Sequence, residues 1–287
     1  MRPLVESCVA QLANPAGRCG QAAVAALESV DQVTFLSGFG TEIPGSASTL
    51  GMRFGRSSRV AAWLRTGAAS ASLPTVLARD GGTRASSFIV PAARLGIASG
   101  VWDGLRIAPT LWGLFSIDLI AEGGVTRFPT GKGYEGWVTG FGLGARIGVL
   151  RESFTVPGIT LSARRQYSRT VRLGDGDSAA EISSLPRVTA LRATMGKDLV
   201  ALGIVVGVGL DLYDADLEMR VDDARTEGSI SGDRRLYFGG LSWNFLFIQL
   251  SAEAGLAEGM EEISGSLESW APEGRATFLS LAIRLTI

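Results

Sequence analysis

Alternation of apolar and polar residues with a period of two is the feature that most constrains the fold of this chain. In residues 275–287, leucine or isoleucine stands at every second position from Leu279 to Ile287, and small or polar residues stand between them. Successive side chains of a strand point to opposite faces, so this segment predicts a strand with one apolar face. Similar segments recur upstream about a dozen times. We therefore expect a fold built almost entirely of strands.

One segment before the strands departs from this pattern. Residues 20–32 are dense in alanine and place Val24, Leu27 and Val30 along one face at helical spacing. We expect a short N-terminal helix there. From residue 33 onward the alternation predicts strands at 33–39, 46–54, 58–70, 86–101, 106–125, 136–150, 158–171, 187–196, 199–220, 234–243, 246–257 and 275–287.

The composition indicates strands that face a membrane. The chain is 46% hydrophobic with a mean hydropathy of +0.24, and charged residues make up 19%, below the average of about 25%. No run of about 18 uncharged apolar residues is present, so no transmembrane helix is expected. Charged residues are almost absent from the predicted outward faces, which the alternative fold, a soluble β-rich protein, would expose to water.

The connections between the predicted strands form a second, independent pattern. Counted back from the C-terminus, long connections at 258–274, 221–233 and 172–186 alternate with tight turns at 244–245 and 197–198. Long loops at one end and tight turns at the other resemble bacterial outer-membrane β-barrel proteins. The resemblance covers about residues 33–287. The last strand of such proteins usually ends on an aromatic residue, and Ile287 departs from that pattern.

This resemblance implies an all-β fold, a closed antiparallel transmembrane β-barrel in a bacterial outer membrane. We expect about 12 strands, with 10 or 14 as alternatives. Outer-membrane lipid and lipopolysaccharide would be its surroundings. Residues 1–32 would form an N-terminal segment, either periplasmic or a plug of the lumen, and residues 33–287 would form the barrel.

Two cysteines, Cys8 and Cys19, both lie in the first twenty residues. In an exported chain we expect them to form a disulfide, worth about 3 kcal/mol. Two free thiols or a weak metal pair are the alternatives. No apolar signal core precedes Cys8, so for an exported protein we expect either that the export signal has been removed or that the start of the chain is misassigned.

Histidine is absent from the chain. This excludes Ser-His-Asp and Cys-His catalysis and most zinc sites. We therefore predict no enzymatic activity, no metal site and no cofactor. A Ser-Lys or carboxylate-only catalytic site is the alternative that the absence of histidine leaves open. The net charge of −1 gives no indication of a nucleic-acid partner.

Charges of both signs fall on the predicted inward face. One interpretation is a charged constriction that selects small anionic solutes. The other, which the mixture of signs favours, is a set of salt bridges that fill a narrow lumen and stiffen its wall. These residues are Arg53, Arg94, Asp118, Glu122, Arg146, Arg164, Arg192, Asp211, Glu253 and Arg284.

Glycine is dense on the inward faces of residues 136–150 and 199–212. Small residues leave space that the N-terminal helix would fill, or they line a smooth passage for apolar substrates, as in fatty-acid-type transporters. A third interpretation, which we rank first, is that glycine permits strong coiling of the sheet.

These patterns favour a narrow passive channel or transporter for small solutes. About twelve strands lie between the side-chain-filled barrel of 8 strands and the open porin of 16. Two alternatives remain. One is a structural or interaction barrel with a filled lumen, which binds a partner protein through acidic loops or its N-terminal segment. The other is a carrier for hydrophobic molecules. A water-wide path would favour the channel, a packed lumen the structural role, and an apolar pocket the carrier.

Overall fold

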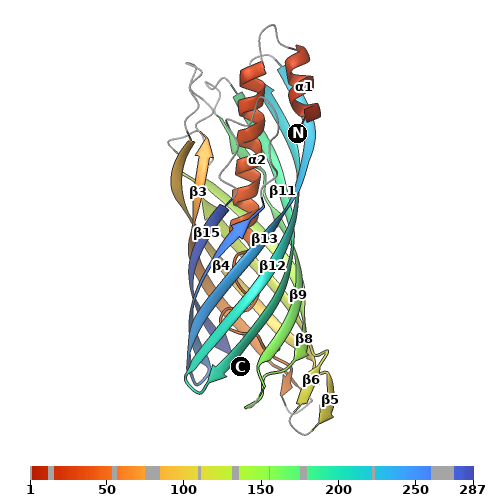
Figure 1. Ribbon diagram of the computed structural model, residues 1–287, viewed down its shortest axis with the longest axis vertical. Coiled ribbons are helices and arrows are strands. Elements are labelled where there is room, and N and C mark those ends of the chain that lie inside the picture. The colour runs from red at the N-terminus through yellow and green to blue at the C-terminus, as the bar shows by residue number, and fades with distance from the viewer. Residues whose placement is uncertain are drawn as a thin grey trace.

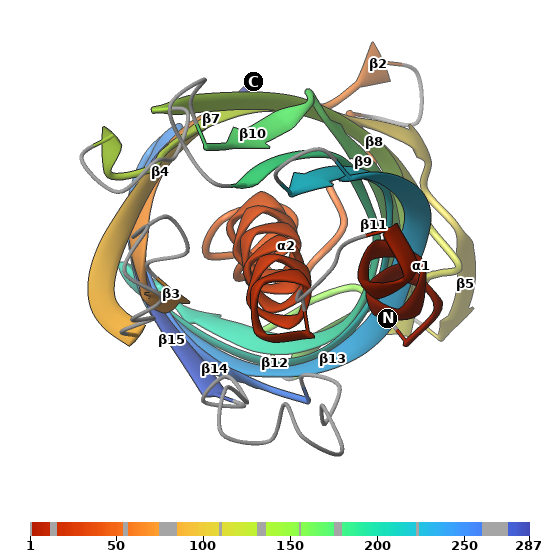
Figure 2. The same cartoon turned by 90° about the horizontal axis from the view of Figure 1, so that it is seen from above.

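A closed antiparallel β-barrel encloses an α-helix in the computed structural model of the protein (Figures 1 and 2). The structure describes residues 2–11, 16–53, 57–74, 85–108, 111–130, 136–154, 156–174, 180–221, 224–259 and 275–287. The helices are α1 (Arg2–Gln11) and α2 (Ala16–Gly38). The strands are β1 (Met52–Arg53), β2 (Ser57–Ser58), β3 (Val60–Pro74), β4 (Ala85–Trp102), β5 (Leu105–Ala108), β6 (Leu111–Leu114), β7 (Ile117–Arg127), β8 (Trp137–Leu150), β9 (Gly158–Ser168), β10 (Val171–Leu173), β11 (Ala180–Leu199), β12 (Leu202–Val221), β13 (Ala224–Phe245), β14 (Ile248–Glu258) and β15 (Arg275–Thr286).

Ten strands form the ring, in the order β11-β12-β13-β14-β15-β3-β4-β7-β8-β9, and β9 pairs back to β11. The strand number is therefore ten, one of the two alternatives to the preferred twelve. β10 pairs with the first residues of β11 and is not one of the ten ring strands. β1 pairs with β2, and β5 pairs with β6, in two small separate sheets.

The difference of two strands comes from the N-terminal part of the chain. The predicted strand at 33–39 is wrong, because α2 continues through residue 38, and the predicted strand at 46–54 contains only β1. The predicted long loop at 221–233 is also wrong, since β12 and β13 extend through most of it as paired strands. The two tight turns lie two to three residues later than predicted, at 246–247 and 200–201.

The two ends of the barrel differ. The last residues of β3, β7, β12 and β14 lie at one end, together with α1 and the N-terminus (Figure 1). We name this the loop end. The C-terminus and the tight turns lie at the opposite end, the turn end. α2 runs from the loop end down into the middle of the barrel (Figures 1 and 2).

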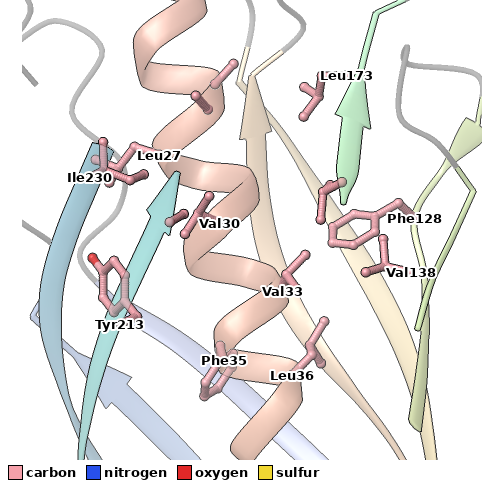
Figure 3. Close-up of a cluster of buried hydrophobic side chains, with 14 of the residues drawn as sticks. Leu27, Val30, Val33, Phe35, Leu36, Phe128, Val138, Leu173, Tyr213 and Ile230 are labelled. Atoms are coloured by element: carbon pink, nitrogen blue, oxygen red, sulfur yellow. The ribbon is translucent and has the colours of Figure 1, made fainter. Parts of the chain in front are cut away.

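α2 is buried on every side because the barrel surrounds it. Leu27, Val30 and Leu36 are completely buried, as is Phe35. Figure 3 shows these side chains among partners from the barrel wall, including Tyr213 of β12, Ile230 of β13 and Val138 of β8. Among the described residues, neither helix is long and apolar enough to cross a membrane.

An apolar belt surrounds the outside of the barrel. On β12 the outward side chains of residues 202–212 include exposed Leu202, Val206 and Leu212, with Val206 46% exposed. Eleven strand residues tilted by about 40° span about 25–28 Å, which matches the height of the apolar band of outer-membrane barrels. A wide exposed apolar surface of this kind on a closed barrel of even strand number makes the protein a transmembrane β-barrel.

β11, β12 and β13 continue beyond this belt at the loop end. We name this extension, residues 180–188, 213–221 and 224–234, the collar. Its outward side chains are charged and paired, as in the ion pairs Arg187–Asp216 at 2.5 Å, Arg220–Glu181 at 2.6 Å and Arg225–Glu218 at 2.8 Å. Most of its inward side chains are apolar and buried, among them Ile182, Leu217, Met219, Val221 and Ile230. They belong to the same hydrophobic core as α2 and the Cys8–Cys19 disulfide.

Candidate functional site

The lumen is filled by residues 19–51, which we name the plug. Of residues 22–51, all are buried except Ser46 and Ser48, which are partly buried. The plug comprises most of α2 and the irregular segment that follows it toward the turn end. The barrel wall holds it at three levels along the lumen.

The upper level is an ion-pair cluster around Asp31 of α2. Arg234 of β13 donates to a carboxylate oxygen of Asp31 at 2.7 Å and to one of Asp211 at 2.9 Å. Arg192 of β11 contacts the other Asp211 oxygen at 2.6 Å. The guanidinium of Arg234 also lies 4.9 Å from the ring centroid of Phe35, a cation–π contact. The alternating charges satisfy one another in a buried environment.

The middle level lies at the C-terminus of α2, whose last carbonyl groups have no partner inside the helix. Three wall arginines donate hydrogen bonds to carbonyl groups at this end. Arg94 donates to the carbonyl of Leu36 at 2.8 Å and Arg192 to that of Gly38 at 2.7 Å. Arg65 donates to the carbonyl of Phe39 at 2.7 Å. Cations at this position also stabilise the negative end of the helix macrodipole.

Carboxylates of the wall complete the middle level. Glu253 of β14 accepts hydrogen bonds from the backbone amides of Thr41 and Gly45, each at 3.0 Å. Glu122 of β7 faces Arg94 at 2.9 Å and Arg164 at 3.3 Å. Arg164 in turn lies 3.9 Å from Glu42 of the plug.

The plug turns sharply at Gly40 and Gly45, which both have positive φ (75° and 66°). A Cβ atom at Gly40 would lie 2.2 Å from a Glu253 oxygen, and one at Gly45 would lie 2.9 Å from the Cβ atoms of Ser242 and Ser251. Glycine is therefore required at both positions by backbone conformation and by the close approach of the wall.

The lower level binds residues 44–50 by their backbone. Arg146 of β8 donates to the carbonyls of Ser46 and Ser48, at 3.1 and 2.6 Å, and pairs with Asp118 at 2.9 Å. Asp118 accepts a hydrogen bond from the amide of Leu50 at 3.0 Å. Further contacts come from Arg284 to the carbonyl of Pro44, Gln249 to that of Gly45 and Arg151 to that of Leu50.

Most of the predicted inward residues meet in this network. Arg94, Asp118, Glu122, Arg146, Arg164, Arg192, Asp211 and Glu253 are buried, and Arg284 reaches the plug backbone. Arg53 lies on β1, outside the ten-stranded ring, and its side chain is outside the described part. The prediction missed Arg65 and Arg234 of the wall, although both fall within the predicted strands 58–70 and 234–243 and both side chains are buried on the inward faces of β3 and β13.

The charges of wall and plug are complementary. In the described part of the ten ring strands, seven inward arginines, at positions 65, 94, 146, 164, 192, 234 and 284, exceed the four inward carboxylates at 118, 122, 211 and 253. The plug contains three carboxyl groups, Glu28, Asp31 and Glu42, and no lysine or arginine. Asp31 and Glu42 face wall arginines.

Glu28 differs from the other two carboxyl groups. It lies about one helical turn closer to the loop end than Asp31, at the level of the collar, and is 2% exposed. Among the described residues neither of its oxygens has a hydrogen-bond partner. Burial, and to a smaller extent the nearby Asp31, raise the pKa of Glu28 to about 9. This carboxyl group is therefore protonated at neutral pH.

The inward glycines make room for side chains of neighbouring strands. A Cβ atom at Gly142 would lie 2.5 Å from the side chain of Gln166, and one at Gly209 would lie 2.6 Å from that of Arg192. One at Gly207 would lie 2.3 Å from the ring of Phe238. The space beside these glycines is thus occupied by wall side chains rather than left as a smooth passage.

The part of the chain that the structure describes contains no group of three or more histidine, cysteine, aspartate or glutamate side chains that could hold a metal ion. Cys8 and Cys19 form a disulfide, as predicted. It ties α1 to α2 at the loop end.

No protein-family model matches the chain, and neither does the sequence of any curated protein. Solved structures that resemble it are bacterial outer-membrane barrels. The translocator domain of the autotransporter NalP from Neisseria meningitidis is 10% identical with a TM-score of 0.46, over 79% of this chain and 88% of that one. The outer-membrane protease OmpT from Escherichia coli is 13% identical with a TM-score of 0.45, over 84% and 100%. An outer-membrane channel from Pseudomonas putida F1 is 10% identical with a TM-score of 0.39, over 85% and 99%.

By name these three proteins are a translocator domain, a protease and a channel. The apolar belt, the even number of antiparallel strands and the asymmetry of loops and turns place this protein in a bacterial outer membrane. In such barrels the long loops face the cell exterior and the short turns the periplasm.

Proposed function

We propose that the protein is an outer-membrane interaction barrel, whose lumen is closed by its own plug and whose collar and α1 bind a partner outside the cell. The collar carries this proposal. It continues about ten residues per strand beyond the apolar belt, which at the tilt of such barrels is about 25 Å.

The collar is built like the surface of a soluble domain. Its outer face has charged pairs and its inner face borders an apolar core. The Cys8–Cys19 disulfide cross-links α1 and α2 within that core. A barrel that served only to cross the membrane would need none of this, since strands of 9–11 residues suffice for the crossing. The extra length holds an ordered surface away from the lipid.

The filled lumen supports the same proposal. Backbone groups from residue 36 to residue 50 of the plug are bonded by wall side chains at the middle and lower levels. Full-length protein in a planar bilayer is therefore expected to be silent. The plugged lumen has no catalytic role in this proposed function.

Site-specific photo-crosslinking on intact cells tests the binding function. A photoreactive residue at Ser229 or Ser231, both exposed on the collar, is expected to give defined adducts with a protein outside the cell. The matched position is Val206, which faces the belt and should give lipid adducts alone. If the collar positions give no adduct beyond those of Val206 in any growth condition, the interaction function is wrong.

A narrow passive channel for small solutes is the second candidate. The observation that favours it is the polar interior of the wall: once residues 19–51 are set aside, the ten strands enclose arginines, carboxylates, glutamines and hydroxyl groups. A wall that needed only to be filled is more stable with apolar side chains in it. In this view the structure is the closed state of the channel. A hydrophobic carrier gains no support, because the glycine-lined wall is covered by its own side chains.

A further inference from the structure

We propose that the arginine-lined lumen is a pathway for small anions, and that the plug closes it by placing its own carboxylates and carbonyl oxygens where anions would bind. This inference rests on the second function proposed above and gives it a substrate class.

The first observation is what the arginines bind now. Arg65, Arg94 and Arg192 donate to the carbonyl oxygens at the C-terminus of α2. That end of a helix carries about half a negative charge. Guanidinium groups that hold this end offer the same donors to a free anion, because they bind carboxylate and phosphate oxygens with similar geometry.

The second observation is the net charge that the barrel wall would have without the plug. Seven arginines against four carboxylates give the wall an excess of three positive charges. In the closed state Asp31 and Glu42 offset two of them, and the C-terminus of α2 offsets part of the third. A vacated lumen would keep the whole excess inside a low-dielectric wall, which attracts anions and repels cations.

The third observation is the distribution of the arginines along the lumen. Arg234 lies at the upper level, Arg65, Arg94 and Arg192 at the middle level, and Arg146 at the lower level. An anion leaving one site would therefore meet another nearby. Several sites of moderate strength along one pore allow conduction, whereas a single strong site traps the ion.

The ten-stranded ring limits the size of the substrate. It is slightly wider than the side-chain-filled barrel of 8 strands and far from the open barrel of 16. The pathway thus suits chloride, phosphate and small carboxylates. Chloride is the probe for the test.

Planar-bilayer recording of the full-length protein tests the inference. Asp31→Asn combined with Glu42→Gln weakens the plug and leaves every wall residue unchanged. The wild type should be silent and the double variant should conduct. In a tenfold gradient of potassium chloride its reversal potential should move toward the chloride limit, about 59 mV for a tenfold ratio of a monovalent ion.

A reversible disulfide between the plug and the barrel wall supplies the control. A Cβ atom at Gly38 would lie 3.7 Å from the Cβ of Ala190, within the range of a disulfide. Gly38→Cys and Ala190→Cys are added to the double variant. When the new disulfide is oxidised, the protein should conduct no current, and when it is reduced, the current should return. The double variant without the new disulfide, treated with the same reductant, controls for reduction of Cys8–Cys19.

A second set of variants tests the wall. Arg164→Gln with Arg192→Gln, in the same double variant, should move the reversal potential back toward zero. Currents that are cation-selective or unselective in the double variant would overturn the inference. A silent double variant would overturn it as well, since the acidic groups would then not close the pathway. Cation-selective or unselective currents would contradict only the anion class and leave the channel function in place, whereas a silent double variant would contradict the channel function as well.

Discussion

At the scale of single residues, Glu28 is a buried carboxyl group of the plug whose protonation is linked to folding. Its folded-state pKa of about 9 lies above the ordinary value of 4.5, so the folded protein holds this proton more tightly than the unfolded chain. Stability therefore falls as pH rises from about 4.5 to about 9 and is constant beyond these limits. At pH 7 the accumulated cost is about 3 kcal/mol.

Glu28→Gln should remove this dependence. The variant should melt at a higher temperature than the wild type at pH 8 and at nearly the same temperature at pH 4, where both side chains are neutral. Thermal unfolding in detergent, followed by circular dichroism, measures the difference. Equal pH profiles of the two proteins would mean that Glu28 is ionised or solvated in the folded state.

Loss of Arg234 should be costly, because this arginine pairs with two buried carboxylates. Arg234→Met leaves Asp31 without its partner and Asp211 with one partner fewer, so we expect a loss of about 3–5 kcal/mol. Adding Asp31→Asn should recover part of this loss. Urea unfolding of both variants measures the coupling. The control is Arg225→Met, whose exposed ion pair on the collar is expected to contribute at most about 1 kcal/mol.

The period-two pattern of the sequence predicted most of the interior charges because the strands that carry them are long and regular. It could not find their partners. Glu28, Asp31 and Glu42 lie on the plug, and a period-two pattern in the wall contains no information about what fills the lumen. Arg234 was missed because β13 was expected to begin there.

At the scale of elements, the Cys8–Cys19 disulfide should decide how firmly α1 is held. Replacing both cysteines with alanine removes a cross-link over a separation of 11 residues, worth about 3 kcal/mol. The amides of α1 should then exchange with deuterium faster, while those of β7, which lies opposite β13 in the ring, should be unchanged. Unaltered exchange in α1 would show that packing alone holds it against β13.

The helix–strand error at 33–39 belongs to this scale too. Residues 33–39 read V-T-F-L-S-G-F, and their β-branched and aromatic residues favour a strand. The structure makes most of them helical because they are enclosed by a barrel, where an element that is apolar all round is stable and its carbonyls are bonded by arginines. Enclosure by the barrel overrides the local preference for a strand, and the local sequence pattern does not predict this enclosure.

At the scale of the whole molecule, the apolar belt predicts how the protein responds to charges on its surface. Val206→Arg places a cation near the middle of the belt and should cost about 2–4 kcal/mol in lipid vesicles. Ser229→Arg, on the outward face of the collar, should change stability by less than about 0.5 kcal/mol. Unfolding in vesicles measures both. Similar effects at the two sites would mean that the membrane does not end where the belt ends.

The passage of the plug through the lumen sets which side of the membrane each terminus faces. Ten strands alone are an even number of crossings and return a chain to the side from which it started. The plug enters at the loop end and reaches β3 at the turn end, so it adds one crossing and makes the total odd. The two termini therefore face opposite compartments. An epitope attached before α1 would be open to antibodies on whole cells, and one attached after β15 would be reached only from the periplasm.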